Sequence, residues 1–224
     1  MRARAISRRF DSFAGTPEDD NHYHISVPTF DRATASRSSL DLATVVAHEA
    51  LVEELHRTPD MQTRLRQMVE RRELPPCYLR NRFVMEAPEA SIVPLTLYVD
   101  GISYTARDNL IAWHIHNMVT DQRHFLVGIR SHDLCRCGCK GWDSTLGIHL
   151  YLKWTLSALL HGRWPDTRHD GSEWQEADGF RKVLAGSLLG VRACVVMIKS
   201  DCSCACFICV FKILLIVLTL LLGF

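Results

Sequence analysis

Residues 95–130 decide the fold, and their sequence is LTLYVDGISYTARDNLIAWHIHNMVTDQRHFLVGIR. The stretch contains three runs rich in β-branched, aromatic and aliphatic residues, which is typical of strands. The connection before the third run, Thr120–Arg123, is short and polar, as a hairpin requires. We therefore predict three consecutive antiparallel strands, at Leu95–Asp100, Ile111–His116 and His124–Arg130.

Helical periodicity flanks this predicted sheet on both sides. Downstream, apolar residues surround the segment Ser144–His161 and leave one polar stripe, which predicts a helix buried on most of its circumference. A shorter helix over about 173–189 and a strand over Arg192–Lys199 are predicted to follow. Upstream, the spacing of apolar residues predicts one helix from Ser38 or Ser39 to about His56 and a second from Thr58 to about Glu73.

The fold class predicted from this order is α/β (α+β). It combines N-terminal helices, a three-stranded antiparallel hairpin sheet, a buried helix, a further strand and a C-terminal transmembrane-like helix. The polar start of the chain mixes Ser, Thr, Pro, Asp and Arg, and such a composition buries too little apolar surface to offset chain entropy. The predicted segments are a disordered leader (1–38), a helical segment (39–74), an α/β domain (93–201) and a transmembrane helix (207–224).

The composition excludes several classes of protein. The chain has 224 residues, of which 47% are apolar and 23% charged, so it is neither collagen-like nor wholly disordered. Its 26 Lys and Arg residues nearly balance 25 Asp and Glu residues, for a formal net charge of +1. This balance leaves almost no global field to attract phosphate, and there is no strong nucleic-acid signal.

The most apolar segment is residues 207–224, FICVFKILLIVLTLLLGF, in which only Lys212, Thr219 and Gly223 are not apolar. As a helix it would be roughly 27 Å long, close to the hydrocarbon thickness of a bilayer. Basic residues precede it, which favours a cytosolic N-terminal part, a tail anchor and membrane lipid as the partner. The alternatives are a buried C-terminal helix or strand pair, and a mistranslated or truncated terminus.

A cysteine-rich loop is the best metal candidate. Cys135, Cys137 and Cys139 place three thiols within five residues, and the fourth ligand would be His132, three positions earlier, or a distant Cys77 or Cys194. These residue types are ligands for tetrahedral Zn²⁺. In a cytosolic chain the thiols are expected to be reduced, which favours metal over disulfide. The alternative is a surface loop of unremarkable or reactive cysteines.

His114 and His116 form a second pair of candidate ligands. They share one face of their predicted strand, because side chains alternate with period two. Two histidines on one face can hold a metal ion. A half-exposed polar face is the more common meaning of such a pair.

Two predicted strands end in an aspartate, in the segments LTLYVDG (95–101) and VVMIKSD (195–201). Three strands, a helix and a further strand in this order resemble the ribonuclease H-like core of the transposase and integrase superfamily, over residues 93–201. The resemblance implies that the two strands are parallel and that Asp100 and Asp201 bind Mg²⁺ as catalytic residues for phosphoryl displacement. A further carboxylate of that family would have to come from Glu173, Glu176 or Asp178.

Three functions from different classes follow. The first is a single-pass, tail-anchored membrane protein of unidentified activity, which rests on residues 207–224. The second is a truncated or inactive ribonuclease H-like mobile-element nuclease or integrase domain, which rests on Asp100 and Asp201. The third is a zinc-stabilised interaction module, which rests on the cysteine loop. Since no set of catalytic groups is complete in the sequence, an enzyme is not favoured.

Overall fold

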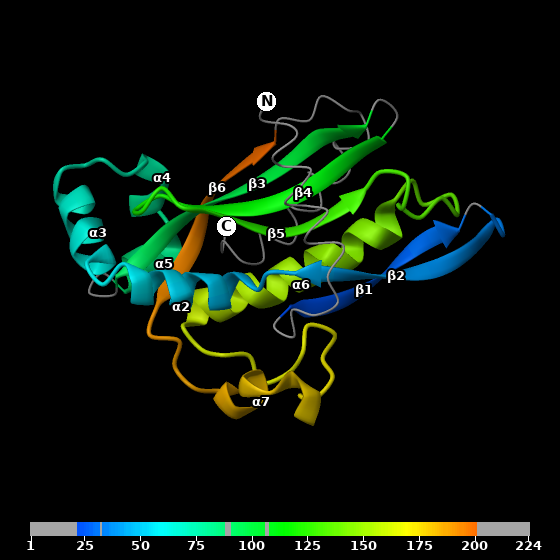
Figure 1. Cartoon of the computed structure of the whole chain (residues 1–224). Coiled ribbons are helices and arrows are strands. Elements are labelled where there is room, and N and C mark those ends of the chain that lie inside the picture. The colour runs from blue at the N-terminus through cyan, green and yellow to red at the C-terminus, as the bar shows by residue number, and fades with distance from the viewer. Residues whose placement is uncertain (1–21, 32, 88–90, 106–107, 201–224) are drawn as a thin grey trace.

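A four-stranded sheet forms the centre of the molecule. The computed structural model describes residues 22–31, 33–87, 91–105 and 108–200 (Figure 1). The strand order is β5-β4-β3-β6. Neighbours among β3, β4 and β5 are antiparallel, as predicted, and β6 pairs parallel with β3. The strands are β3 (Ile92–Thr105), β4 (Asp108–Asn117), β5 (Arg123–Arg130) and β6 (Arg192–Ser200).

Alternation along the strands separates the two faces of this sheet. Leu97 and Trp113 lie on the inner face and are completely buried. Tyr98 and His114 are directly opposite each other on β3 and β4, and both are only half-buried. The period-two pattern of the sequence therefore corresponds to one face in the core and one face that is partly open.

Helix α6 (Trp142–His161) packs against the inner face, and most of the apolar residues around it are buried, whereas Leu150 is exposed (Figure 1). The helix is bounded by Gly141 and Gly162, which adopt φ angles of 84° and 68° that favour glycine. A Cβ at Gly147 would lie 3.1 Å from Cγ1 of Val27. The small residue thus lets α6 approach a second set of strands closely.

That second set is a β-hairpin, which corrects the predicted leader. Strands β1 (Tyr23–Asp31) and β2 (Ser36–Thr44) pair antiparallel, where the sequence suggested disorder up to residue 38 and a helix from Ser38 or Ser39. Alternate β1 residues such as Ile25 and Val27 are buried against α6, whereas their neighbours face solvent. A half-buried strand needs only every second residue to be apolar, so its average composition resembles that of a disordered segment.

The predicted helices other than α6 are shorter than the sequence suggested. The first helix begins at residue 47 because the preceding residues belong to β2, and the second begins at residue 61. The predicted helix over 173–189 is largely replaced by turns at Gly179 and Gly186, whose φ angles are positive. The elements are α2 (Ala47–Arg57), α3 (Met61–Glu70), α4 (Pro76–Leu79), α5 (Arg82–Glu86), the 3-10 helix η1 (Glu176–Asp178) and α7 (Phe180–Leu184).

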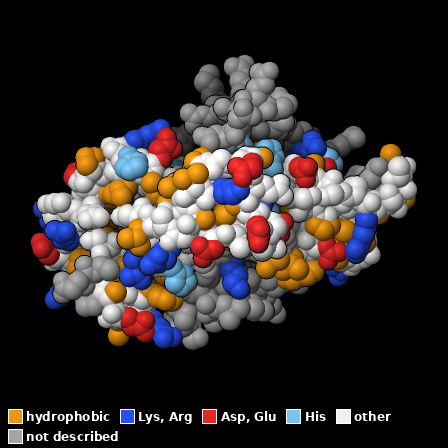
Figure 2. All heavy atoms as spheres, turned by 90° about the horizontal axis from the view of Figure 1, so that it is seen from below, with side chains coloured by type: hydrophobic (Ala, Val, Ile, Leu, Met, Phe, Trp, Pro, Cys, Tyr) orange, Lys and Arg blue, Asp and Glu red, His pale blue; other side chains and the backbone are white. Residues whose placement is uncertain are grey.

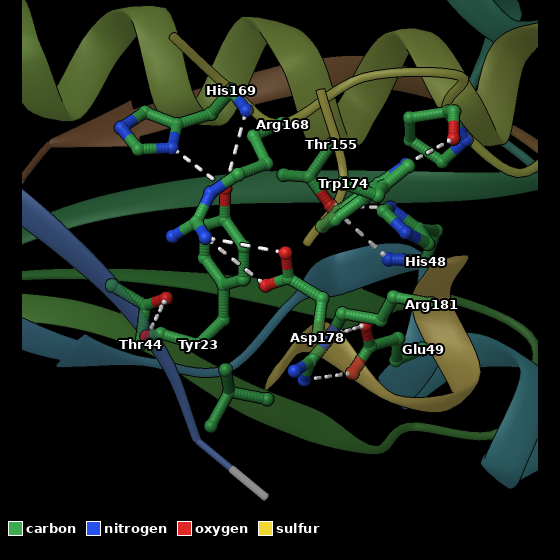
Figure 3. Close-up of polar contacts among 12 residues, drawn as sticks. Tyr23, Thr44, His48, Glu49, Thr155, Arg168, His169, Trp174, Asp178 and Arg181 are labelled. Atoms are coloured by element: carbon green, nitrogen blue, oxygen red, sulfur yellow. Dashed lines mark hydrogen bonds and ion pairs between the residues drawn. The ribbon is translucent and has the colours of Figure 1, made fainter. Parts of the chain in front are cut away.

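Polar pairs fasten the long connection between α6 and β6 to the rest of the molecule. This connection, residues 162–191, lies on the far side of α6 from the sheet (Figure 1). Figure 3 shows side chains of this connection in contact with side chains of β1 and α2. The pairs are Tyr23 with His169 (2.7 Å) and Arg181 with Glu49 (2.6 Å), whereas Arg168 pairs with Asp178 (3.2 Å) within the connection itself.

The structure corrects the membrane interpretation. Within the described part of the chain, no helix has both the length and the apolar character needed to cross a membrane. Residues 207–224, which suggested the anchor, lie outside the described residues. The tail-anchored function and the membrane location are therefore not supported, and the predicted lipid contact of residues 207–224 lies outside the described residues.

A buried histidine on α6 lacks a polar partner among the described residues. His149 is fully buried, and neither of its ring nitrogens makes a hydrogen bond. Its ring meets the edge of Trp113, whose Nε1 also has no partner in this part of the chain. Burial lowers the pKa of His149 to about 4, because the charged ring would be desolvated. The fold thus holds this histidine neutral.

We expect His149→Leu to be at least as stable as the natural chain at pH 7 and clearly more stable at pH 5. The unfolded histidine binds a proton below about pH 6.5 and the folded one does not, so stability falls between pH 6.5 and 4, by about 3 kcal/mol. A leucine side chain does not bind protons, so this loss of stability at low pH disappears, and the unpaired ring nitrogens are no longer present. Thermal melts against pH measure the effect, with the exposed His161→Gln on the same helix as control. A variant that loses stability equally at both pH values would contradict this account.

Candidate metal centre

The cysteine loop connects the end of β5 to the start of α6. Three of its residues have positive φ angles, Gly138 (105°), Lys140 (54°) and Gly141 (84°), so the chain turns sharply. The backbone N–H of Gly141 donates to the carbonyl oxygen of Cys135 over 2.9 Å, which closes the loop on itself. These turns bring cysteines that are two residues apart to the same place.

Four side chains converge there. The sulfur atoms of Cys135, Cys137 and Cys139 and a carboxylate oxygen of Asp143 all lie within 4.8 Å of one another. Cys135 is buried, Cys137 is exposed, and Cys139 and Asp143 are intermediate. Within the described ranges, these four side chains lie close enough together to hold a metal ion.

The spacing of the four atoms fits a tetrahedral zinc ion. Ligand sulfur atoms at about 2.3 Å from Zn²⁺ in tetrahedral geometry are roughly 3.8 Å apart. The observed separations exceed that value by at most about 1 Å, so small side-chain movements would complete the shell. Three soft sulfur ligands favour zinc over magnesium or calcium, which prefer oxygen. Four protein ligands leave no position open for water or substrate.

Arg37 of β2 lies against two of these candidate ligands. Its Nη2 donates to Sγ of Cys137 over 2.7 Å and to Oδ2 of Asp143 over 2.9 Å. Three thiolates and a carboxylate would leave a bound Zn²⁺ with a net negative charge, which this guanidinium offsets. Asp143 also occupies the first turn of α6, where the helix dipole favours an anion.

The cysteines differ in their readiness to lose a proton. The hydrogen bond from Arg37 lowers the pKa of Cys137 to about 7, because the cation stabilises the thiolate. Burial raises the pKa of Cys135 to about 11, because desolvation disfavours its thiolate. The loop therefore presents one thiol that ionises easily and one that ionises only with a strong partner such as a metal ion.

The structure replaces His132 by Asp143 as the fourth candidate ligand. Both ring nitrogens of His132 face carboxylates, with Nδ1 2.6 Å from Asp108 and Nε2 2.9 Å from Asp133. Asp143, in the first turn of α6, is not among the ligands that the sequence suggested. The sequence signal for Asp143 is its position four residues after Cys139, because a loop that turns back on itself brings residues at this spacing together. No signal in the sequence points to Arg37, which is about one hundred residues away.

The remaining candidates are not part of this centre. His114 and His116 both contact the ring of Tyr98 on the open face of the sheet, and Nε2 of His116 lies 2.7 Å from Asp121. Asp100 is half-buried and lies opposite Ala112 in the sheet. Asp201 lies outside the described residues. The structure therefore brings together the three cysteines and leaves the two histidines in a different region.

Comparisons with known proteins return no relative. No protein-family model, no curated protein and no solved structure matches the chain. The assignment of a function therefore rests on the geometry of the site itself.

We expect zinc affinity to rise at least about tenfold per pH unit between pH 6 and 8, since zinc must displace the proton of Cys135. The dependence should be steeper below about pH 7, where Cys137 is protonated as well. Competition with a chromophoric chelator across this pH range measures it. Cys77→Ser, which removes an exposed thiol outside the cluster, should give the same slope. An affinity that does not change with pH would contradict the thiolate ligands.

Proposed function

We propose that this chain is a zinc-stabilised α/β interaction module with one structural Cys₃Asp site. The observation that carries the proposal is the convergence of three cysteine sulfurs and the Asp143 carboxylate within 4.8 Å, with Arg37 donating to two of them. A closed set of four ligands supports a structural role, because a catalytic zinc ion keeps a position for water.

The proposed site would join three parts of the chain. The cysteines belong to the loop after β5, Asp143 belongs to α6, and Arg37 belongs to the hairpin. The backbone N–H of Cys135 already donates to Oγ of Ser144, and that hydroxyl donates to the carbonyl oxygen of Pro28. A metal ion would add strong bonds to this existing junction, so its binding would contribute directly to folding stability.

The surface is compatible with a protein partner rather than a polyanion. Figure 2 shows basic and acidic side chains interspersed on the face that carries α7. Some apolar side chains are strongly exposed in this region, including Val183 and Leu188 at 83% and 71%. Mixed charge with exposed apolar residues supports contacts with proteins more than contacts with nucleic acid.

Elemental analysis of the purified chain tests the proposal, and we expect one equivalent of zinc. Free zinc at about 1,000 times the dissociation constant stabilises the folded state by about 4 kcal/mol. For a chain of this size that corresponds to roughly 8–16 °C in Tm. A chelator should therefore lower the Tm by this amount and zinc should restore it. Zinc well below one equivalent, with no change in Tm, would overturn the proposal.

The identity of the fourth ligand gives a sharper test. We expect Asp143→Asn to weaken zinc binding by at least about 10-fold, because a neutral amide is a poor ligand for Zn²⁺. The matched control is His132→Asn, which should leave zinc affinity within about threefold, since His132 is bound by Asp108 and Asp133 instead. If the histidine variant loses zinc and the aspartate variant keeps it, the ligand set described above is wrong.

A second candidate function has one observation in its favour. Strands β3 and β6 are parallel neighbours, and Val99 is paired with Ser200, the residues before Asp100 and Asp201. This is the placement that a resemblance to ribonuclease H-like enzymes implies. We propose, as the alternative, a nuclease or integrase domain of that superfamily, in which Asp100 and Asp201 would hold Mg²⁺.

Metal-dependent nicking of DNA by the full chain tests this alternative. If the domain is active, Asp100→Asn should reduce nicking by roughly 100-fold, because a carboxylate that holds the metal ion is lost. The matched control is Asp41→Asn, an exposed aspartate of β2, which should have no effect. Absence of nicking with Mg²⁺ or Mn²⁺, or equal activity in both variants, counts against an active nuclease.

A further inference from the structure

We propose that the cysteine cluster is also an oxidation site, at which a hydroperoxide converts Cys137 and Cys139 to a disulfide and releases the zinc ion. This inference rests on the proposed zinc site and adds its regulation. The three cysteines have different roles in this reaction because their surroundings differ.

Exposure selects the cysteine that reacts first. Cys137 is exposed, Cys139 is partly exposed, and Cys135 is fully buried. A small hydrophilic oxidant therefore reaches the sulfur of Cys137 most easily. Arg37 holds its Nη2 2.7 Å from that sulfur, although the Arg37 side chain itself is 62% exposed. A peroxide that reacts at this sulfur would lie next to the guanidinium, whose positive charge would favour the negative charge that develops on the departing oxygen.

Loop geometry selects the second cysteine. The three sulfurs lie within 4.8 Å of one another, so a neighbouring thiolate is in reach once the first sulfur is oxidised. Between Cys137 and Cys139 stands Gly138, which has a φ angle of 105°, and a Cβ added to it would meet no described atom within 4 Å. Glycine in open space allows the backbone change that a disulfide across one residue needs.

The reaction is a two-electron oxidation in two steps. The thiolate of Cys137 attacks one oxygen of the peroxide, the O–O bond breaks, and the departing oxygen takes a proton from solvent to leave as water or alcohol. The product is a sulfenic acid. The thiolate of Cys139 then attacks this sulfur, the S–S bond forms, and hydroxide departs and is protonated to water. Two thiolates are oxidised to one disulfide, and the peroxide is reduced by two electrons.

Oxidation removes two of the four zinc ligands. Cys135 and Asp143 alone give too few donors for a structural site, which requires four. The ion would leave, and the junction between the loop, α6 and the hairpin would lose its metal bonds. A thiol reductant reverses the disulfide, so the change is a switch between two states rather than damage.

The experiment uses the zinc-loaded full chain and hydrogen peroxide. Zinc release is followed with a chromophoric chelator, and disulfides are located by peptide mapping, because the chain has nine cysteines and a simple thiol count is ambiguous. We expect one equivalent of zinc to be released together with a Cys137–Cys139 disulfide. Dithiothreitol with added zinc should restore binding. The control is Cys77→Ser, which should release zinc at a rate within about twofold of the natural chain.

The outcomes separate this inference from the proposed function. If zinc is bound and stays bound under peroxide, with Cys137 and Cys139 still reduced, the zinc site stands and the oxidation site is refuted. A disulfide that forms elsewhere without release of zinc refutes it as well. If the chain binds no zinc at all, the proposed function fails, and the inference that depends on it fails too.

Discussion

The contact on which the rest of the structure depends is the packing of α6 between the four-stranded sheet and the β1–β2 hairpin. Ile148, Leu152 and Leu159 are buried in the core, and Gly147 allows β1 to approach closely. A helix that is apolar on most sides requires cover on more than one side. The sheet packs against one side of α6, and the hairpin and the connection between α6 and β6 pack against other sides. Through α6 the two sets of strands share one hydrophobic core.

The candidate metal centre depends on the same contact. The start of α6 places Asp143 beside the cysteine loop, and the hairpin places Arg37 beside both. Ser144, in the first turn, connects the backbone of the loop to that of β1. The site is thus located where three elements meet, and its ligand atoms are held by the core rather than by the loop alone. Such a location is suited to a metal ion that stabilises a fold.

Buried polar groups divide into two kinds in this protein. Glu54 is buried but accepts hydrogen bonds from Asn117 and Thr120 and pairs with His124. His149 is equally buried and has no polar partner in the described part of the chain. A paired polar group joins elements, in this case α2 with the β4–β5 hairpin, whereas an unpaired one lowers stability. Since His149 faces Trp113 in the core and not the cysteine loop, its effect on stability at low pH is separate from the pH dependence of metal binding.

By itself the sequence determined the central strands, the helix after them, the strand at Arg192 and the three cysteines. These features depend on local spacing, period two for strands and about 3.6 for helices, and on residue chemistry. Only the tertiary structure decided that residues 23–44 form a hairpin, that Asp143 replaces His132, and that Arg37 joins the site. The hairpin is buried by its contact with α6, and Arg37 lies 106 positions before Asp143 in the sequence. A local sequence pattern does not predict such contacts, because they form only when the core brings the segments together.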